Sequence, residues 1–268
     1  MKILFVGDIV GRSGRQILKD AFKNFDLRSK YDFIIVNAEN AAGGFGITNK
    51  VLEELLQLDI DCFTMGNHTF DKRDGEQVLL HNKVIRPANL PPNVVGSGYG
   101  IFNSKLGNVA VINLLGRVFM QPVDCPFRSF DSLYSEIKKE CDIVIVDFHA
   151  EATSEKNALG CYLDGRASAV VGTHTHVPTA DCKILPNKTA YVTDVGMTGS
   201  TAGIIGFKKD SIIQKFLTYI PKKFEVEVID PQLQAVCIDV DERGRAKSIE
   251  RVFYPEKMCS EGETLIND

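Results

Sequence analysis

The sequence lacks the features that mark membrane proteins and general nucleic-acid binders. No stretch approaches the ~20 consecutive apolar residues that a membrane-spanning helix needs. The net charge is only −4, from 31 basic and 35 acidic residues, so the chain has no general field for holding long nucleic acid or an anionic membrane. We therefore expect no membrane association and no stable complex with long nucleic acid.

Metal-type cysteine spacing and a leader segment are also missing. The seven cysteines include no C-x-x-C pair and are odd in number, which favours free buried thiols over disulfides or a zinc ribbon. The opening residues, MKILFVGDIVGRSGR, carry a short apolar run that meets Asp8 too soon for a secretory signal. We interpret this run as a first core strand and expect a cytoplasmic protein.

The remaining composition is that of a globular protein, with 44% hydrophobic and 25% charged residues. No internal repeat, low-complexity tract or linker is apparent, so residues 1–268 are predicted to form one domain. Short β-branched runs alternate with helical patterns, which is typical of an α/β sheet with helices on its faces. The predicted strands are Lys2–Val6, Asp32–Val36, Asp61–Met65, Val109–Leu114, Asp142–Val146, Ala167–Val171 and Thr189–Val192.

The predicted helices are Arg12–Phe25, Asn49–Leu58, Ser129–Glu140, Ser154–Leu163 and Asp210–Leu217. The pattern changes after the last of these helices. Phe224–Ile229, Leu233–Val240 and Ala246–Phe253 alternate, so we predict an antiparallel meander or hairpin that closes the sheet edge.

Five of the predicted strands are followed at once by polar residues of metal-binding type. These residues are Asp8, Glu39, Asn67, His149, His174 and His176. Ligands of α/β sheets bind at the carboxyl ends of the strands, so the five loops are expected to meet at one rim. Four of the five histidines lie in these loops; only His81 lies outside them.

The residue types indicate which metals such a rim would hold. Carboxylate, amide oxygen and imidazole together favour manganese, iron, zinc or cobalt over a thiolate-type site. About seven ligands are too many for one tetrahedral zinc and fit two metals that share a bridge. A single aspartate or histidine at a strand end is more often a turn, a cap or a satisfied polar group, but the combination at five strand ends favours the metal site.

Two motifs carry a family resemblance. Residues 66–68 (GNH) and 172–176 (GTHTH) resemble motifs of the calcineurin-like metallophosphoesterase superfamily. Val10 stands where that superfamily has the histidine of Asp-x-His, and Glu39 replaces its bridging aspartate. Those departures match a narrower group, the YmdB-like bacterial family of 2′,3′-cyclic nucleotide phosphodiesterases. The matching segments are 7–12, 37–40, 66–71, 116–120, 147–156, 172–177 and 193–199.

The resemblance implies a four-layer α/β/β/α sandwich with mixed sheets and a two-metal centre. One metal would take Asp8, Glu39, Asn40 and His176, and the second would take Glu39, Asn67, His149 and His174, with Glu39 bridging. The metals would be two divalent ions, iron or manganese first and zinc, cobalt or magnesium as alternatives. A metal-bridging hydroxide would attack a small phosphodiester, a cyclic nucleotide above all, and His68 would be the proton donor. The resemblance also implies a homo-oligomer, and it is less clear after Gly199.

Several nearby residues have two interpretations from the sequence. Asp71 either orients His68 or caps the following helix, with equal weight. For Arg12 and Arg117, solvated charges are slightly favoured over phosphate contacts. Glu151 is a candidate partner behind the metal ligands.

Three further residues are predicted to have structural roles only. We expect Lys156 to be a surface charge, and we expect Phe119 and Met120 to fill the core rather than contact a base.

Other functions remain open from the sequence. The same centre suits a phosphomonoesterase or a nuclease, and a regulatory or scaffold protein with incidental hydrolysis is a further alternative. A dinucleotide-binding fold is disfavoured, because Gly7 and Gly11 lack the G-x-G-x-x-G spacing.

Overall fold

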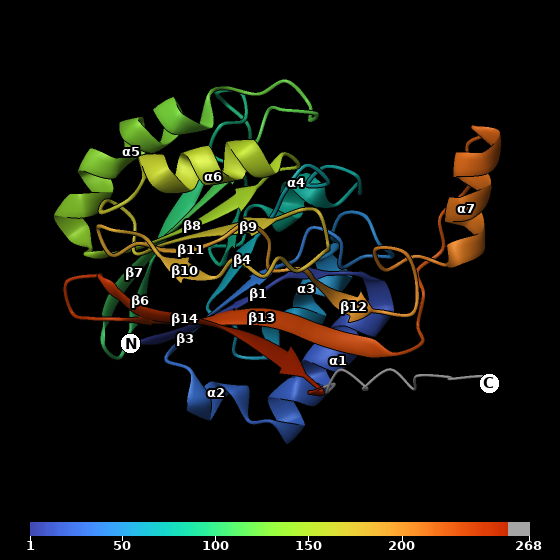
Figure 1. The fold of residues 1–268 in the computed structure, drawn as a ribbon, viewed down its shortest axis with the longest axis horizontal. Coiled ribbons are helices and arrows are strands. Elements are labelled where there is room, and N and C mark those ends of the chain that lie inside the picture. Colours follow the sequence, from blue (N-terminus) through green and yellow to red (C-terminus); the bar gives the residue numbers. More distant parts are fainter. Residues whose placement is uncertain (257–268) are drawn as a thin grey trace, which may run out of the picture.

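The computed structural model describes residues 1–256 as two β-sheets packed face to face with helices on their outer faces (Figure 1). An eight-stranded sheet has the order β2-β12-β13-β1-β3-β4-β5, with β14 paired to β13. Its strands are β1 (Lys2–Val6), β2 (Asp8–Ile9), β3 (Phe33–Asn37), β4 (Cys62–Thr64), β5 (Val84–Ile85), β12 (Met197–Ser200), β13 (Pro231–Val240) and β14 (Ala246–Tyr254).

The second sheet has six strands in the order β10-β11-β9-β8-β7-β6. They are β6 (Tyr99–Ser104), β7 (Gly107–Leu115), β8 (Ile143–His149), β9 (Ala169–Thr173), β10 (Lys183–Ile184) and β11 (Ala190–Val192). Both sheets mix parallel and antiparallel pairs. The architecture confirms the four-layer α/β/β/α sandwich.

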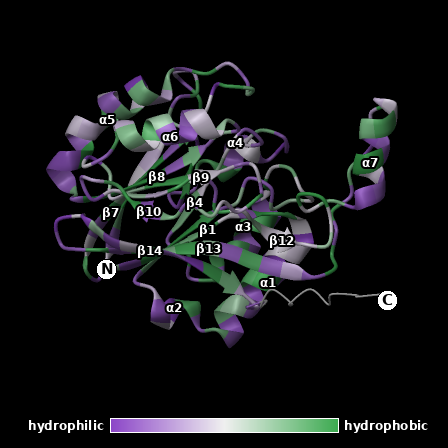
Figure 2. Cartoon of the chain, viewed as in Figure 1, coloured by the Kyte–Doolittle hydropathy of each residue, from purple (hydrophilic) through white to green (hydrophobic). Residues whose placement is uncertain are grey.

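Alternation along the strands explains why the sheets stack. In β1, Ile3 and Phe5 join the cluster shared by the two sheets, whereas Leu4 and Val6 join the cluster under the outer helices. Successive side chains of a strand point to opposite faces, so a central strand with apolar residues on both faces is buried from both sides. In Figure 2, green stretches run through the central strands, whereas the helices carry green and purple residues together.

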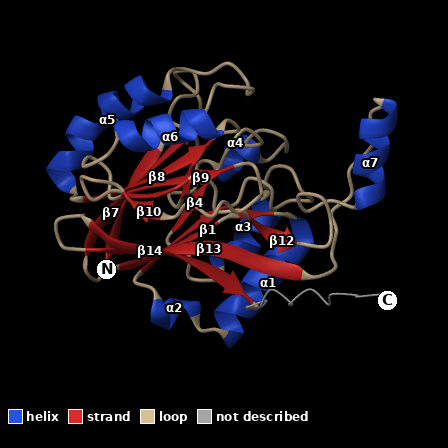
Figure 3. Cartoon of the chain, viewed as in Figure 1, coloured by secondary structure: helices blue, strands red, loops and turns tan. Residues whose placement is uncertain are grey.

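The helices divide between the two outer faces (Figures 1 and 3). The helix α1 (Gly11–Asn24) buries Ile17, Leu18 and Ala21 with the eight-stranded sheet. The helices on the other side are α5 (Pro126–Glu140) and α6 (Thr153–Tyr162). The remaining helices are α2 (Leu27–Lys30), α3 (Asn49–Leu56), α4 (Gly75–Val78) and α7 (Lys209–Thr218), and α7 stands apart from the layers (Figure 1).

All seven predicted strands and five predicted helices are present, with ends that differ by a few residues. The prediction for the C-terminal meander is wrong in one respect. Phe224–Ile229 is not a strand and makes one isolated bridge, between Val226 and Phe207. The predicted hairpin is confirmed: among the described strands β14 pairs only with β13, at an edge of the sheet, and β13 also pairs with β1 and β12. Its length and its buried residues 232–236 suit an interior strand paired on both sides.

Two simpler expectations concern membranes and thiols. Within residues 1–256, no helix is long and apolar enough to cross a bilayer. The described cysteines are all free, as predicted, but only Cys62 and Cys141 are buried; Cys125, Cys182 and Cys237 are half-buried and Cys161 is exposed. Cys259 lies outside the described residues.

Candidate metal centre

The candidate ligands come from strand ends of both sheets. Asp8 follows β1, Glu39 follows β3 and Asn67 lies just beyond β4, all in the eight-stranded sheet. His149 ends β8, and His174 follows β9 in the six-stranded sheet. The structure thus brings the predicted residues together where the carboxyl ends of strands from two sheets meet.

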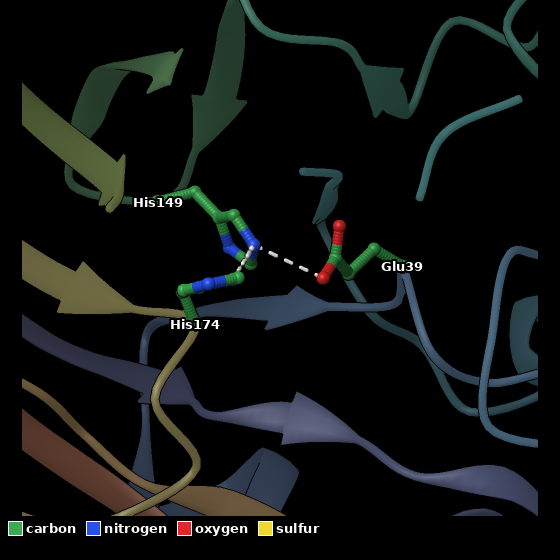
Figure 4. A group of neighbouring side chains, drawn as sticks. All are labelled: Glu39, His149 and His174. Atoms are coloured by element: carbon green, nitrogen blue, oxygen red, sulfur yellow. Dashed lines mark hydrogen bonds and ion pairs between the residues drawn. The ribbon is translucent and has the colours of Figure 1, made fainter. Parts of the chain in front are cut away.

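One group of donor atoms surrounds the His149 ring (Figure 4). The Nε2 atom of His149 lies 3.0 Å from Oε1 of Glu39 and 2.9 Å from Oδ1 of Asn67. The same nitrogen lies 3.0 Å from Nδ1 of His174. Ligating atoms of Glu39, His149 and His174 all lie within 4.8 Å of one another, a spacing that suits a shared cation.

A second group adjoins the first through Glu39. The Nδ2 atom of Asn40 lies 3.1 Å from Oε1 of Glu39 and 3.1 Å from Nε2 of His176. The Oδ1 atom of Asp8 lies 3.9 Å from the same His176 nitrogen. Glu39 therefore lies between the two groups, which is the place a bridging carboxylate needs.

Two buried oxygens test whether these residues suit metal ions. Oδ1 of Asp8 and Oδ1 of Asn40 are buried, and neither accepts a hydrogen bond from any residue in 1–256. Leaving buried polar atoms unpaired costs free energy, and such atoms call for an explanation. Burial also raises the pKa of Asp8. A divalent cation would satisfy both oxygens and compensate the charge of the Asp8 carboxylate. These residues therefore suit a site for divalent metal ions.

The charges of the cluster are strongly coupled. Burial alone would raise the pKa of Glu39, but His149 and His68 together outweigh it and lower this pKa to about 2. Burial opposes protonation of His149, but Glu39 raises its pKa to about 9. Burial and the neighbouring charge of His149 lower the pKa of His174 to about 3. His174 is therefore neutral, the form in which an imidazole binds a metal, whereas a cation would compete with a proton at His149.

Hydrogen bonds behind the rim orient the imidazoles. Nδ1 of His149 lies 2.9 Å from Oγ1 of Thr173, which donates to Asp147 at 2.7 Å. Burial raises the pKa of Asp147 to about 6. Nδ1 of His176 bonds the carbonyl oxygen of Ile205 at 2.9 Å. Such partners set which ring nitrogen faces a metal.

The sequence predicted some of these supports and missed others. Nε2 of His174 lies 3.1 Å from Oε2 of Glu151, in line with the predicted partner role. Thr173 and Asp147 were missed although both lie inside recognised motifs, and their alternation with His149 along paired strands was the available signal. Nothing in the sequence pointed to the carbonyl of Ile205, because this contact joins residues 29 positions apart.

His68 has a separate arrangement. Its Nδ1 lies 2.7 Å from Oδ2 of Asp71, and its backbone N–H donates to Oε2 of Glu39 at 3.0 Å. Its ring meets that of Phe45 edge-on at 4.9 Å. The capping alternative for Asp71 is wrong, because α4 begins after Asp74. The Nε2 atom has no hydrogen-bond partner among the described residues.

Two structural roles expected from the sequence are wrong. Lys156 is 1% exposed and donates to Oδ2 of Asp194 at 2.6 Å, so it is a buried charge. The loop that carries Phe119 is held by Glu155, which accepts hydrogen bonds from the backbone N–H groups of Arg117 and Val118. Phe119 is therefore 89% exposed, with φ +62°. Met120 packs against the core as expected. Arg12 and Arg117 are exposed, as the solvated alternative requires.

Known proteins resemble this chain over nearly its whole length. A Bacillus subtilis (strain 168) protein named 2′,3′-cyclic-nucleotide 2′-phosphodiesterase is 47% identical over 255 residues, which cover 94% of this chain and 97% of that protein. A crystal structure of a hypothetical protein from Thermus thermophilus has a TM-score of 0.90 at 40% identity, covering 95% of this chain and 99% of the other.

A more distant likeness shows the fold alone. The crystal structure of a 5′-nucleotidase precursor, also from Thermus thermophilus, has a TM-score of 0.57 at 13% identity and covers 94% of this chain but 54% of the other. The profile of one family, described as YmdB-like protein, matches residues 4–252. The chain therefore belongs to the YmdB-like protein family.

Proposed function

We propose that the chain is a metal-dependent phosphodiesterase that hydrolyses small phosphodiesters, 2′,3′-cyclic nucleotides in particular. The observation that carries the proposal is the convergence of buried carboxylate, amide and imidazole donors around Glu39. The name of the Bacillus subtilis relative supplies the substrate class.

The donor set divides between two ions in this proposal. Asp8, Glu39, Asn40 and His176 would hold one ion, and Glu39, Asn67, His149 and His174 would hold the other. Iron or manganese suits this mixture of oxygen and imidazole donors, with zinc, cobalt or magnesium as alternatives. When bound, the pair would supply a low-pKa water and stabilise the negative charge that develops on phosphate oxygens.

The chain's own part in the reaction lies chiefly with His68. Opening a cyclic phosphodiester expels a ribose alkoxide, which is a poor leaving group without a proton. The 2.7 Å contact between Nδ1 of His68 and Asp71 fixes the ring, so that a proton on Nε2 can be donated to that oxygen.

A comparison of three substrates tests the proposal. Metal-free protein would be reconstituted with Mn²⁺ and assayed with 2′,3′-cyclic AMP, p-nitrophenyl phosphate and a single-stranded oligonucleotide. We expect the highest kcat/KM for the cyclic nucleotide. A preference for the monoester or the oligonucleotide would instead establish the phosphomonoesterase or nuclease alternative, and no turnover of any of them would leave the regulatory role.

The Asp71→Asn variant is expected to lower kcat about 10-fold or more while the metal content stays unchanged. An amide in place of the carboxylate holds Nδ1 of His68 less firmly, so the ring is less well oriented to donate its proton from Nε2. The Asp74→Asn variant is a matched control, because Asp74 Oδ2 accepts instead from the backbone of Asn49 at 3.1 Å. Equal kcat values for the two variants would contradict the role of Asp71.

We further propose a cytoplasmic homo-oligomer that works as one domain. Ligands drawn from both sheets support a single unit, because neither sheet supplies a complete set. The apolar side chains of Phe216 and Leu217 on α7 are 83% and 73% exposed, as surfaces buried between subunits are in an isolated chain. Light scattering on the purified protein tests the oligomeric state, and a monomer would refute it.

A further inference from the structure

We propose that the buried pair of Lys156 and Asp194 is a positioning device for the loop that carries His174 and His176. Lys156 lies on α6, and Asp194 lies between β11 and β12. The inference rests on the proposed metal centre and adds residues that do not contact the ions. It assigns a role to a lysine that sequence patterns place on the surface.

The loop adopts a backbone conformation that side chains disfavour. His174 has φ +102° and His176 has φ +64°, where residues other than glycine are uncommon. Such conformations persist only where the surrounding structure holds them, and they gather at functional sites. Without outside support, the segment would relax and turn the two imidazoles apart.

The support reaches the loop through its middle residue. The backbone N–H of Thr175, between the two histidines, donates to Oδ2 of Asp194 at 3.1 Å. The other oxygen of Asp194 accepts from the N–H of Gly196 at 2.8 Å. One carboxylate thus ties the loop after β9 to the turn before β12.

Lys156 compensates the charge of the buried Asp194 carboxylate. Asp194 is 0% exposed, and Nζ of Lys156 lies 2.6 Å from Oδ2, the same oxygen that accepts from Thr175. A buried charge without a partner would take a proton or draw in water. The lysine ammonium therefore compensates the carboxylate and holds its Oδ2 atom where the loop meets it.

The carboxylate is itself held by a rigid frame. Three hydrogen bonds join Thr179 to the backbone of Asp194. Its Oγ1 accepts the N–H of Asp194 at 2.9 Å, and its N–H and its hydroxyl donate to the Asp194 carbonyl at 3.1 and 3.3 Å. Nη2 of Arg251 on β14 donates to the same carbonyl at 3.2 Å. Gly172 allows the close approach, since a Cβ there would lie 1.7 Å from the carbonyl oxygen of Thr193. Asp194 therefore has a fixed position and can hold the loop in place.

Mn²⁺ titration of metal-free protein tests the role directly. The Lys156→Met variant is expected to bind Mn²⁺ about 10- to 100-fold more weakly than the wild type. In the metal-free protein, the amide of Thr175 should also exchange with solvent faster, since its acceptor is no longer held. Arg28→Met is the control: Arg28 bonds Asp61 at 2.6 Å, before β4 and away from the strand ends of the site, so Mn²⁺ affinity should be unchanged.

A double variant separates positioning from general stability. Lys156→Met with Asp194→Asn removes the buried charge, but an amide can accept from only one of the two N–H groups. We expect this protein to melt at a higher temperature than the single variant while Mn²⁺ binding stays weak and exchange at Thr175 stays fast. Recovery of Mn²⁺ affinity together with melting temperature would overturn the inference, as would wild-type affinity in Lys156→Met. If the wild type itself bound no Mn²⁺, the proposed metal centre would fail instead.

Discussion

Replacing Gly66 by alanine is expected to remove most metal binding and to lower turnover by about 10²-fold or more, although glycine offers no ligand. A Cβ at this position would lie 2.2 Å from Oε2 of Glu39 and 2.5 Å from Nε2 of His149. Both distances are far below van der Waals contact, so the two central ligands would have to move. Misplacing reactive groups by about 1 Å can cost about 10²-fold in rate.

Metal content and kcat of Gly66→Ala would be measured beside Gly43→Ala. A Cβ on Gly43 meets nothing within 4 Å, but its φ of +71° strains an alanine, so that variant should lose only about 1 kcal/mol of stability. It should keep its metals. If Gly66→Ala bound metals like the wild type, Glu39 and His149 would not be the centre of the site.

Replacing His68 by alanine is expected to lower kcat by about 10²- to 10⁴-fold, the usual contribution of a positioned acid. The bound metal should be unaffected, because the contact between residue 68 and Glu39 runs through the backbone N–H, which alanine retains. The loss should also be smaller for a substrate with a good leaving group, such as bis(p-nitrophenyl) phosphate, which needs little help from an acid.

His81→Ala is the matched control for that variant. The His81 ring accepts the backbone N–H of Lys83 through Nδ1, at 3.2 Å, and lies outside the strand-end rim. Its loss should leave kcat unchanged. Full activity of His68→Ala, or an equal loss for both substrates, would remove His68 from the role of acid.

Both predictions rest on a site whose pieces are local in sequence. Glu39 and His149 each sit at the end of a short buried strand, so an apolar run that stops at a polar residue identifies them without knowledge of the fold. His68 and Asp71 are only three positions apart, so their pairing could also be predicted from the local sequence. A short apolar strand of this kind is buried whatever its position in the sheet.

The supports of the site are decided by contacts between distant residues. Lys156 and Asp194 are 38 positions apart, and a lysine on a helix is ordinarily solvated, so its burial had no local signal. The position of β13 beside β1 was likewise missed, because alternation predicts a strand but does not name its partner.

The strands, the residues at their ends and the kind of metal that such donors prefer follow from the amino-acid sequence alone. These depend on the hydrophobic pattern and on side-chain chemistry, which act over a few residues. The folded structure was needed to establish that the rim joins two sheets, that Glu39 lies between two groups of donors, and that a buried ion pair holds two strained histidines. Those features exist only after distant segments pack, because burial and close approach create the charge coupling and the backbone strain.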